Sequence, residues 1–330
     1  MYEALYGLKQ SPFNVTPDPQ FLYLGEKHRE ALAHLVYGVK REKGFIVITG
    51  EVGTGKTTLI RCLLERFDGS NGTKAAFLFN PKLSATDFLR FILQDLGLTV
   101  QGKTKADSLH TLNEYLLQAY ERGEKVILIV DEAQGLHPQV LEEIRLLSNL
   151  ETSKSKLLQI ILVGQPELDR TLSGREFRQI RQRINLRYHL LPLSEEETKE
   201  YIEKRLQIAG AHDPIFTDRA MQEVYRHSRG IPRLINILCD NALLNGYASE
   251  QMVIDQKPVR DAARDLKLRK TFRVGWVWIL LSVLMVGCIL SYIRLAEIGK
   301  LDTLLTDFLR FLQPLKDFIW GLMKPFSTIL

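Results

Sequence analysis

The stretch GFIVITGEVGTGKTTLIRCLLERF, which ends at Phe67, constrains the fold more than any other part of the chain. Residues 45–49 are β-branched or aromatic, the pattern of a buried parallel strand, and residues 59–67 have helical spacing. Between them the sequence fits G-x-x-x-x-G-K-[ST], a loop whose glycines let backbone N–H groups turn toward phosphate oxygens. This strand–loop–helix setting predicts a nucleotide phosphate-binding site rather than a chance glycine-rich turn.

The residues of this loop have distinct predicted roles. Lys56 is expected to reach the β- and γ-phosphates and Thr57 to supply a magnesium ligand, while the helix N-terminus adds positive potential. The predicted ATP-binding residues of the loop are Gly50, Glu51, Val52, Gly53, Thr54, Gly55, Lys56, Thr57 and Thr58.

Two acidic residues follow a second apolar run, in KVILIVDEAQGL. Residues 126–130 are expected to form a fully buried strand that ends at Asp131 and Glu132. Carboxylates at the tip of a core strand are costly unless a cation or hydrogen bonds compensate, so Asp131 is predicted to hold Mg²⁺ together with Thr57. Glu132 would then orient or deprotonate the attacking water. The alternative is a simple acidic turn after a strand.

A polar side chain also follows the third apolar run, LLQIILVGQPEL. In a parallel sheet the carboxyl ends of the strands converge on the ligand crevice. Gln165 is therefore predicted to sense the γ-phosphate or to position water. An isolated glutamine would carry little meaning, so this prediction depends on the two preceding motifs.

Arginines are dense in the next segment, REFRQIRQRINLRYHLLPL. A guanidinium supplied by a neighbouring subunit can stabilise the charge that develops during phosphoryl transfer. We favour Arg183 for this role, with Arg181 and Arg178 as competitors. The alternative is that these arginines form a solvated helix face.

From Ser194 onward the pattern changes to a series of short helices. Ser194 and Glu197 fit a capping box at the start of the first helix, and Gly210 fits its stop. In SRGIPRLIN, a glycine and a proline break and restart the helix and leave Arg233 in its first turn. The helix dipole does not favour a cation there, so a nucleotide phosphate is expected near Arg233. A structural salt bridge is the alternative.

Several of these motifs belong to a larger set of sequence segments that together resemble a known protein family. The set is GLKQSPFNVTPDPQFLYLGEKHREALAHLVYGV, GEVGTGKTT, LIVDEAQGL, LLSNLE, LVGQPEL and GIPRLINILCDNAL. It spans roughly residues 2–265 and resembles the general secretion pathway protein A, or ExeA-like, branch of the AAA+ ATPases. Similar ATPases encoded with exosortase and pilus systems share it.

The resemblance implies an α/β fold, an αβα sandwich with a parallel sheet followed by a helical lid. It also implies ATP and Mg²⁺ as ligands and ring-like or transient homo-oligomers. Asp131 and Glu132 would be the Walker B acids, and Gln165 and Arg233 the first and second sensors. The N-terminal segment with Phe13 would pack along the nucleotide-binding core and near the adenine, although it also fits a proline-bounded hydrophobic strap without a ligand.

An uncharged apolar run of 20 residues, 274–293, follows the predicted lid. At about 1.5 Å rise per residue, a helix of this length spans the roughly 30 Å hydrocarbon core of a bilayer. More Lys and Arg precede the run than follow it, so the ATPase is expected in the bacterial cytoplasm, anchored by a single pass in the inner membrane. A buried core helix is the alternative. The basic stretch before the run fits anionic lipid better than DNA.

Residues 294–330 carry a helical apolar stripe that Pro314 interrupts. We expect an amphipathic segment on the far side that lies on the membrane or packs against a partner's membrane helices. The predicted organisation is a strap and first helix at 1–43, a P-loop core at 44–193, a lid at 194–266, a basic linker at 267–273, a transmembrane helix at 274–293 and a tail at 294–330.

Composition narrows the function further. The net charge of +5 is mild, and much of the excess precedes the apolar run, which weakens the case for nucleic acid as a partner. The three cysteines have no metal-ligand spacing. The favoured function is a membrane-anchored ATPase that drives or regulates assembly of an envelope secretion, pilus or polysaccharide export apparatus, with protein components of that machine as partners. The alternatives are a DNA-handling ATPase related to transposition or replication initiators, and a nucleotide-gated oligomeric membrane effector in defence.

Overall fold

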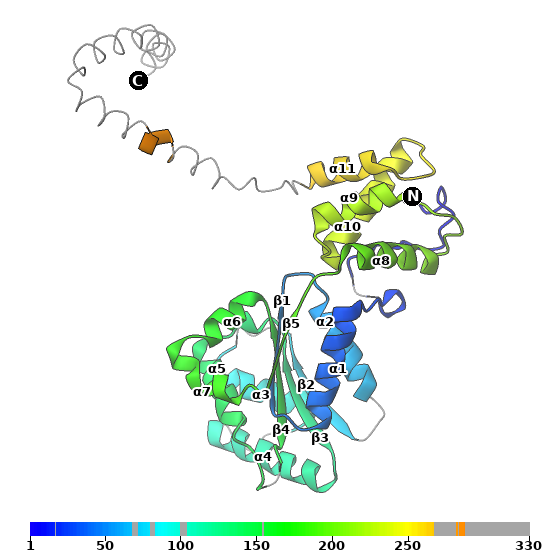
Figure 1. The fold of residues 1–330 in the computed structure, drawn as a ribbon. Helices are drawn as coiled ribbons and strands as arrows, with labels where there is room; N and C mark the ends of the chain where they lie inside the picture. The colour runs from blue at the N-terminus through cyan, green and yellow to red at the C-terminus, as the bar shows by residue number, and fades with distance from the viewer. Residues whose placement is uncertain are drawn as a thin grey trace, which may run out of the picture. The chain divides into compact units, whose positions relative to one another are not determined.

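The computed structural model describes residues 1–16, 18–67, 72–79, 83–99, 104–153, 155–266, 282 and 284–287. Within residues 45–190 five strands form one sheet in the order β2-β3-β4-β1-β5, and all neighbouring strands are parallel (Figure 1). The strands are β1 (Phe45–Gly50), β2 (Thr73–Leu78), β3 (Lys125–Val130), β4 (Leu158–Gly164) and β5 (Leu186–Leu190). Every position of β1 and β4 is buried, as expected for central strands covered on both faces.

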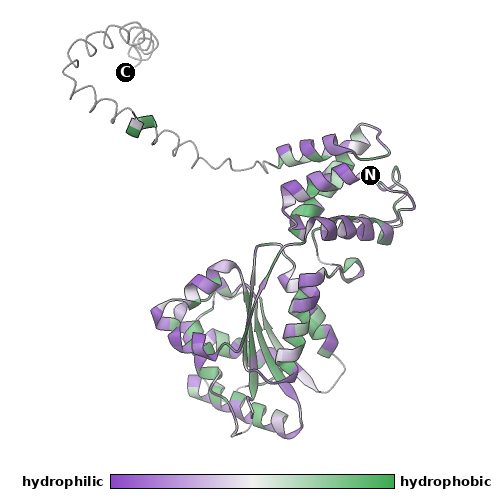
Figure 2. Cartoon of the chain, viewed as in Figure 1, coloured by the Kyte–Doolittle hydropathy of each residue, from purple (hydrophilic) through white to green (hydrophobic). Residues whose placement is uncertain are grey.

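Helices cover both faces of the sheet, and successive strand residues pack alternately toward one face or the other (Figure 1). The helices α1 (Glu26–Lys40) and α2 (Lys56–Phe67) lie on one face. The other face carries α3 (Ala85–Asp95), α4 (Lys105–Glu121), η2 (Ala133–Gly135), α5 (Pro138–Leu147), α6 (Pro166–Leu172), η3 (Arg175–Phe177) and α7 (Arg178–Arg183). Figure 2 shows the hydrophobic residues concentrated in the strands between these layers. The predicted α/β core with a parallel sheet is confirmed.

A four-helix bundle follows the sheet and coincides with the segment that we call the lid, residues 194–266. Its helices are α8 (Glu195–Ile208), α9 (Asp218–Ser228), α10 (Pro232–Ala248) and α11 (Gln256–Asp265). Ser194 and Glu197 form the predicted capping box: the Ser194 hydroxyl accepts from the Glu197 N–H, and the Glu197 carboxylate accepts from the Ser194 N–H. The helix ends just before Gly210, which has a φ of 101°.

The N-terminal strap, which includes η1 (Pro19–Phe21), packs in the hydrophobic core of the lid. Phe13 makes an edge-on contact with Phe216 at a centroid distance of 6.2 Å, and Tyr23 makes one with Tyr201 at 5.7 Å. The prediction that this segment packs along the nucleotide-binding core is wrong for Phe13, Phe21 and Tyr23, which pack in the lid, whereas Leu24 at the end of the strap does pack against the core. Both faces of the sheet are already covered by helices, whereas the small lid bundle gains a core from the aromatic side chains of the strap.

The predicted transmembrane segment lies almost entirely outside the described residues. Within it, residues 282 and 284–287 are helical and exposed. Among all described residues, no helix combines the length and apolar character that crossing a bilayer requires. The basic linker at 267–273 and the tail at 294–330 lie outside the described residues.

Candidate functional site

The glycine-rich loop connects the buried strand β1 to the first turn of α2. Gly53 and Gly55 have φ angles of 81° and 95°, a left-handed region that glycine adopts without strain. A Cβ atom at Gly50 would lie 2.7 Å from the carbonyl oxygen of Leu190, so a side chain cannot be added there without displacing β5. The loop therefore has the tight curvature that the motif predicts.

Lys56 occupies the inside of this loop. Its Nζ atom donates to the carbonyl oxygens of Gly50 at 2.8 Å and Glu51 at 2.9 Å, and the side chain is buried. Burial lowers the pKa of Lys56, while the charges of Glu132 and Asp131 oppose the shift. The loop thus holds an amine close to two acids, at the N-terminus of a helix that itself favours an anion.

Thr57 and Asp131 meet although 74 residues separate them in sequence. The Thr57 hydroxyl donates to Asp131 Oδ2 at 2.7 Å, and the other oxygen, Oδ1, accepts from the Glu132 N–H at 2.8 Å. A hydroxyl and a buried carboxylate at this spacing fit Mg²⁺, which commonly takes few protein ligands and completes its shell with phosphate and water. No group of three or more His, Cys, Asp or Glu side chains suited to a metal occurs among the residues described.

Glu132 lies at the turn after β3, with a left-handed φ of 52° that is uncommon outside glycine. Its Oε2 atom accepts two amide N–H groups, from Gln134 at 2.5 Å and from Gln165 at 3.1 Å. Since the Glu132 side chain is exposed, these bonds set the direction of a carboxylate that water can reach. The structure therefore brings together Glu132 and Gln165, which the sequence analysis selected separately.

Gln134 is a residue of this cluster that the sequence analysis missed. Its Oε1 atom accepts from the Gln165 backbone N–H at 3.0 Å, while its amide donates to Glu132. One side chain thus ties the turn after β3 to the end of β4. The sequence offered little indication of this role, because Gln134 is only an amide two residues after Glu132, at a turn where polar residues are common.

His28 on α1 is a second missed residue, and it contacts the loop at Thr54. Its Nε2 atom lies 2.8 Å from the Thr54 carbonyl oxygen, so Nε2–H donates there. The ring is buried, and its Nδ1 atom has no hydrogen-bond partner among the described residues. Burial lowers the pKa of His28, while the Thr54 carbonyl and the Glu197 charge oppose that effect. A single histidine 26 residues before Thr54 belongs to no sequence motif, so the sequence did not predict this contact.

A further polar network fixes the end of β1 against β5 and α6. The Thr49 hydroxyl donates to Asp169 Oδ2 at 2.8 Å and lies 3.1 Å from His189 Nδ1. Arg187 forms an ion pair with Asp169 at 3.2 Å. Because Thr49 directly precedes Gly50, this network anchors the strand from which the loop begins.

Arg233 of the lid lies against the glycine-rich loop. Its backbone N–H donates to the Gly53 carbonyl at 3.3 Å, and a Cβ atom at Gly53 would lie 2.7 Å from Arg233 Cβ. Among the described residues no hydrogen bond or ion pair engages the Arg233 guanidinium. The structural salt bridge considered as an alternative is therefore not found there.

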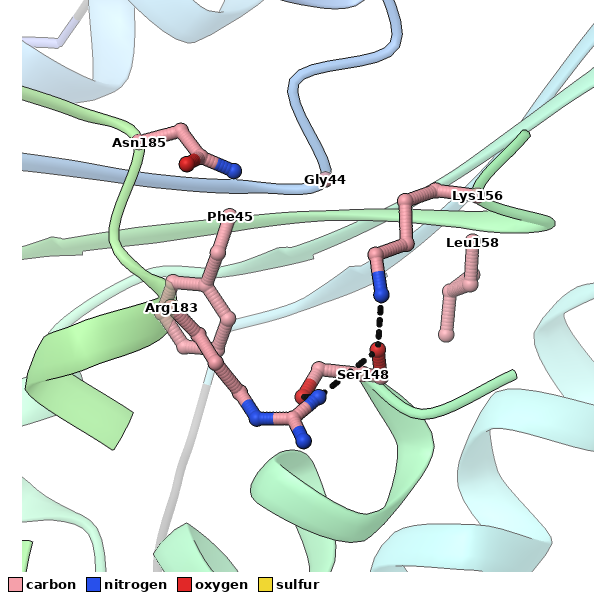
Figure 3. A pocket seen from close by; sticks show the side chains of 7 residues that line it. All are labelled: Gly44, Phe45, Ser148, Lys156, Leu158, Arg183 and Asn185. Atoms are coloured by element: carbon pink, nitrogen blue, oxygen red, sulfur yellow. Dashed lines mark hydrogen bonds between the residues drawn. The ribbon is translucent and has the colours of Figure 1, made fainter. Parts of the chain in front are cut away.

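Arg183 lies at the opposite end of the sheet from the glycine-rich loop. It lines a small cavity beside Phe45 and Leu158, the first residues of β1 and β4 (Figure 3). Its Nη1 atom donates to the Ser148 carbonyl and hydroxyl at 3.2 and 3.1 Å, and Lys156 donates to the same carbonyl at 3.2 Å. Arg183 is therefore remote from the phosphate loop of its own chain.

The two competing arginines lie on the surface, on the helix α7. Arg181 donates to the Ser173 carbonyl at 3.0 Å, and its side chain is exposed. Arg178, the first residue of α7, is exposed as well. No contact of either guanidinium with the glycine-rich loop occurs among the described residues.

The fold and the site together define an AAA-type protein, and comparison with known proteins agrees. Residues 39–172 match the AAA domain family. The chain is 47% identical over 249 residues to General secretion pathway protein A of Aeromonas hydrophila, which covers 75% of this chain. It is therefore an AAA-type protein related to general secretion pathway protein A, as its motifs indicate, and it spans 45% of the length of that relative.

Solved structures share the fold at low sequence identity. The Cdc6p structure from Pyrobaculum aerophilum has a TM-score of 0.60 at 17% identity, covering 76% of this chain and 71% of that chain. The ORC2 protein of Aeropyrum pernix, solved as ADPNP and ADP complexes, has a TM-score of 0.57 at 19% identity, covering 78% and 71%. The ORC1 protein of the same organism, solved with DNA, has 0.58 at 16%, covering 84% and 76%. At such identities the likeness concerns the fold.

Proposed function

We propose that this chain is a membrane-anchored AAA+ ATPase that binds and hydrolyses ATP with Mg²⁺. The observation that carries the proposal is the 2.7 Å contact between Thr57 and Asp131, because it joins the phosphate loop to the acids at the end of β3. In this proposal residues 50–58 bind the phosphates, with Lys56 supplying positive charge. Bound Mg²⁺ would supply charge neutralisation at the β- and γ-phosphates, held by Thr57 and Asp131.

Hydrolysis then depends on the acid and amides beside this loop. Glu132 orients a water molecule and accepts its proton as the water attacks the γ-phosphate. Gln165, whose amide lies 3.1 Å from the Glu132 carboxylate, senses the γ-phosphate or positions the same water. Arg233 brings a positive charge from the lid to the nucleotide.

A neighbouring copy of the chain supplies the remaining positive charge. We propose Arg183 for this role, because it lies at the amino end of the sheet, away from the site of its own chain, and keep Arg181 and Arg178 as competitors. The resulting homo-oligomer, a ring or a transient assembly, forms one complete site at each subunit interface.

The cellular role that we propose is to drive or regulate assembly of an envelope secretion, pilus or polysaccharide export apparatus. Its support is the 47% identity to General secretion pathway protein A and the uncharged run at 274–293. The run would anchor the chain in the bacterial inner membrane, with the ATPase in the cytoplasm and the tail on the far side. Conformational change in the lid would pass through the basic linker to the anchor.

The test of the ATPase is binding and turnover with a matched variant. The wild-type chain is expected to bind ATP in the presence of Mg²⁺ and to release phosphate. Lys56→Ala is expected to abolish both, because the loop loses its buried amine. Isothermal titration calorimetry and a phosphate-release assay measure them, and unchanged ATP affinity in the variant would refute the assignment of the loop.

A further inference from the structure

A single lid carboxylate caps two helices, one in the lid and one in the nucleotide-binding core. Glu197 Oε2 accepts from the Ser194 N–H at 2.9 Å, which completes the capping box of α8. The other oxygen, Oε1, accepts from the Glu26 N–H at 2.5 Å, and Glu26 is the first residue of α1. The N-cap residue of α1 is Gly25, which gives no side-chain cap to a first turn whose N–H groups have no partner within the helix. The lid thus supplies the cap that α1 lacks.

The fit around this shared cap is close. A Cβ atom at Gly25 would lie 2.6 Å from Glu197 Oε1 and 2.9 Å from Leu193 Cδ2. Glycine at this position therefore leaves space for the carboxylate to reach the first turn of α1, and a larger residue would displace the Glu197 carboxylate or the end of the Leu193 side chain.

From this first turn, α1 leads directly to the phosphate loop. His28 follows Glu26 by two residues, and its Nε2–H donates to the Thr54 carbonyl at 2.8 Å. The charge of Glu197 also reaches the buried His28 ring, where it acts on the pKa against the effect of burial. Glu197, the first turn of α1, His28 and Thr54 are thus linked by consecutive contacts.

The lid contacts the same loop along a second route. Gly230, which precedes α10, accepts from the Leu193 N–H at 2.9 Å, and a Cβ atom there would lie 1.9 Å from the Leu193 oxygen. Three residues later, Arg233 contacts Gly53. Residues 193–197 therefore take part in both routes, because Leu193 contacts Gly230 and Glu197 contacts Glu26. The two routes reach the loop at adjacent residues, Gly53 and Thr54.

We propose that Glu197 is a positioning residue that couples the orientation of the lid to the conformation of the phosphate loop, through the first turn of α1 and His28. Lid movement that withdraws the carboxylate uncaps α1, loosens the His28–Thr54 contact and lowers nucleotide affinity. Conversely, a loop ordered by nucleotide favours the capped orientation of the lid, because coupling between two sites is reciprocal. The proposal rests on the proposed function only in assigning the ligand of the loop.

The test compares Glu197→Gln and Glu197→Ala with Glu195→Gln, which removes one charge from the same helical turn. Amide hydrogen exchange of the nucleotide-free, full-length protein is measured first. The Glu197 variants are expected to speed exchange about tenfold in the first turn of α1 and in residues 51–57, whereas Glu195→Gln leaves both unchanged. Faster exchange confined to the start of α8 would overturn the proposal, because Glu197 would then be only a cap of its own helix.

ATP affinity provides the second readout, with Arg233→Ala as a partner variant. Glu197→Ala is expected to weaken ATP binding about fivefold, as the loss of a cap of ordinary strength predicts. If both residues act through lid orientation, the fold-loss of ATP affinity in the double variant is smaller than the product of the two single fold-losses. A double variant whose fold-loss equals that product would overturn the coupling. Glu197→Gln keeps one acceptor oxygen and serves if the alanine variant fails to fold. If the wild-type protein binds no ATP, the proposed function fails, while the exchange measurement still decides the coupling.

Discussion

Basic side chains lie at both ends of the central sheet, yet the groups that surround them differ. At the amino end, Arg183 and Lys156 converge on the Ser148 carbonyl, the C-cap of α5, where cations are favoured by the helix dipole. At the carboxyl end, Lys56 lies in a glycine-rich loop at a helix N-terminus, with two acids beside it. At the amino end, Arg183 and Lys156 already have an acceptor within the chain. At the carboxyl end, the helix N-terminus and Lys56 favour an anion, and the two acids favour a cation.

This difference shows that basic residues near a sheet edge do not by themselves identify a phosphate site. The direction of the neighbouring helix decides which ion the site favours: a helix C-terminus favours cations, and a helix N-terminus favours anions. The amino-end cluster can act in catalysis only when it faces a second molecule.

Arg183→Ala gives the largest expected effect in this series. If Arg183 acts across a subunit interface, phosphate release from the oligomer should fall about 10³-fold with unchanged ATP affinity, because a guanidinium at the developing charge contributes this much. Ser148→Ala is the matched control, since it removes the hydroxyl partner inside the chain. Equal losses in both variants would make the amino-end cluster purely structural, and a loss in Arg181→Ala alone would move the role to that residue.

Glu132→Gln is expected to lower turnover at least about 10²-fold while ATP still binds, because the amide cannot accept the proton of water. Single-turnover phosphate release and calorimetry separate the two quantities. Asp131 stays in place in this variant, so the site of Mg²⁺ is retained. Normal turnover would remove Glu132 from the chemistry of the carboxyl end.

Gln134→Ala is expected to slow phosphate release about tenfold at saturating ATP, with little change in KM. The substitution removes one amide donor to the Glu132 carboxylate and the acceptor of the Gln165 N–H, bonds of a strength that accounts for such a loss. Gln139→Ala, an exposed glutamine nearby on α5, is the control. A wild-type rate in Gln134→Ala would show that Gln165 alone orients the acid.

The smallest effect concerns the stability conferred by the neutral His28 ring. Above the ordinary histidine pKa of about 6.5, both folded and unfolded chains carry the neutral ring. Because burial lowers the pKa in the folded chain, only the unfolded chain takes up a proton as the pH falls below that value. The free energy of unfolding therefore falls between the unfolded pKa and the lower folded pKa.

Thermal unfolding at pH 7.5 and pH 5.5 measures this contribution. His28→Gln retains a donor for the Thr54 carbonyl but does not titrate, so its loss of Tm on acidification should be smaller than that of the wild type by about 3 °C. Equal losses would show that His28 titrates as it does in the unfolded chain.

The sequence by itself determined those features of the protein that depend on neighbouring residues. The apolar runs at β1, β3 and β4, the glycine-rich loop and the capping box of α8 follow from local spacing, because strand periodicity, left-handed glycines and helix caps are fixed within a few residues. The same local order placed acids and an amide at the carboxyl ends of strands, where a parallel sheet brings them together.

Only the tertiary structure decided which distant side chains meet. Gln134 became the link between Glu132 and Gln165 because β3 and β4 are neighbours in the sheet, and Glu197 became the cap of α1 across 171 residues. The strap joined the lid because the sheet was already covered on both faces. Each of these contacts forms because it is more favourable than the other contacts that distant segments of the chain could make. A short stretch of sequence therefore cannot predict it.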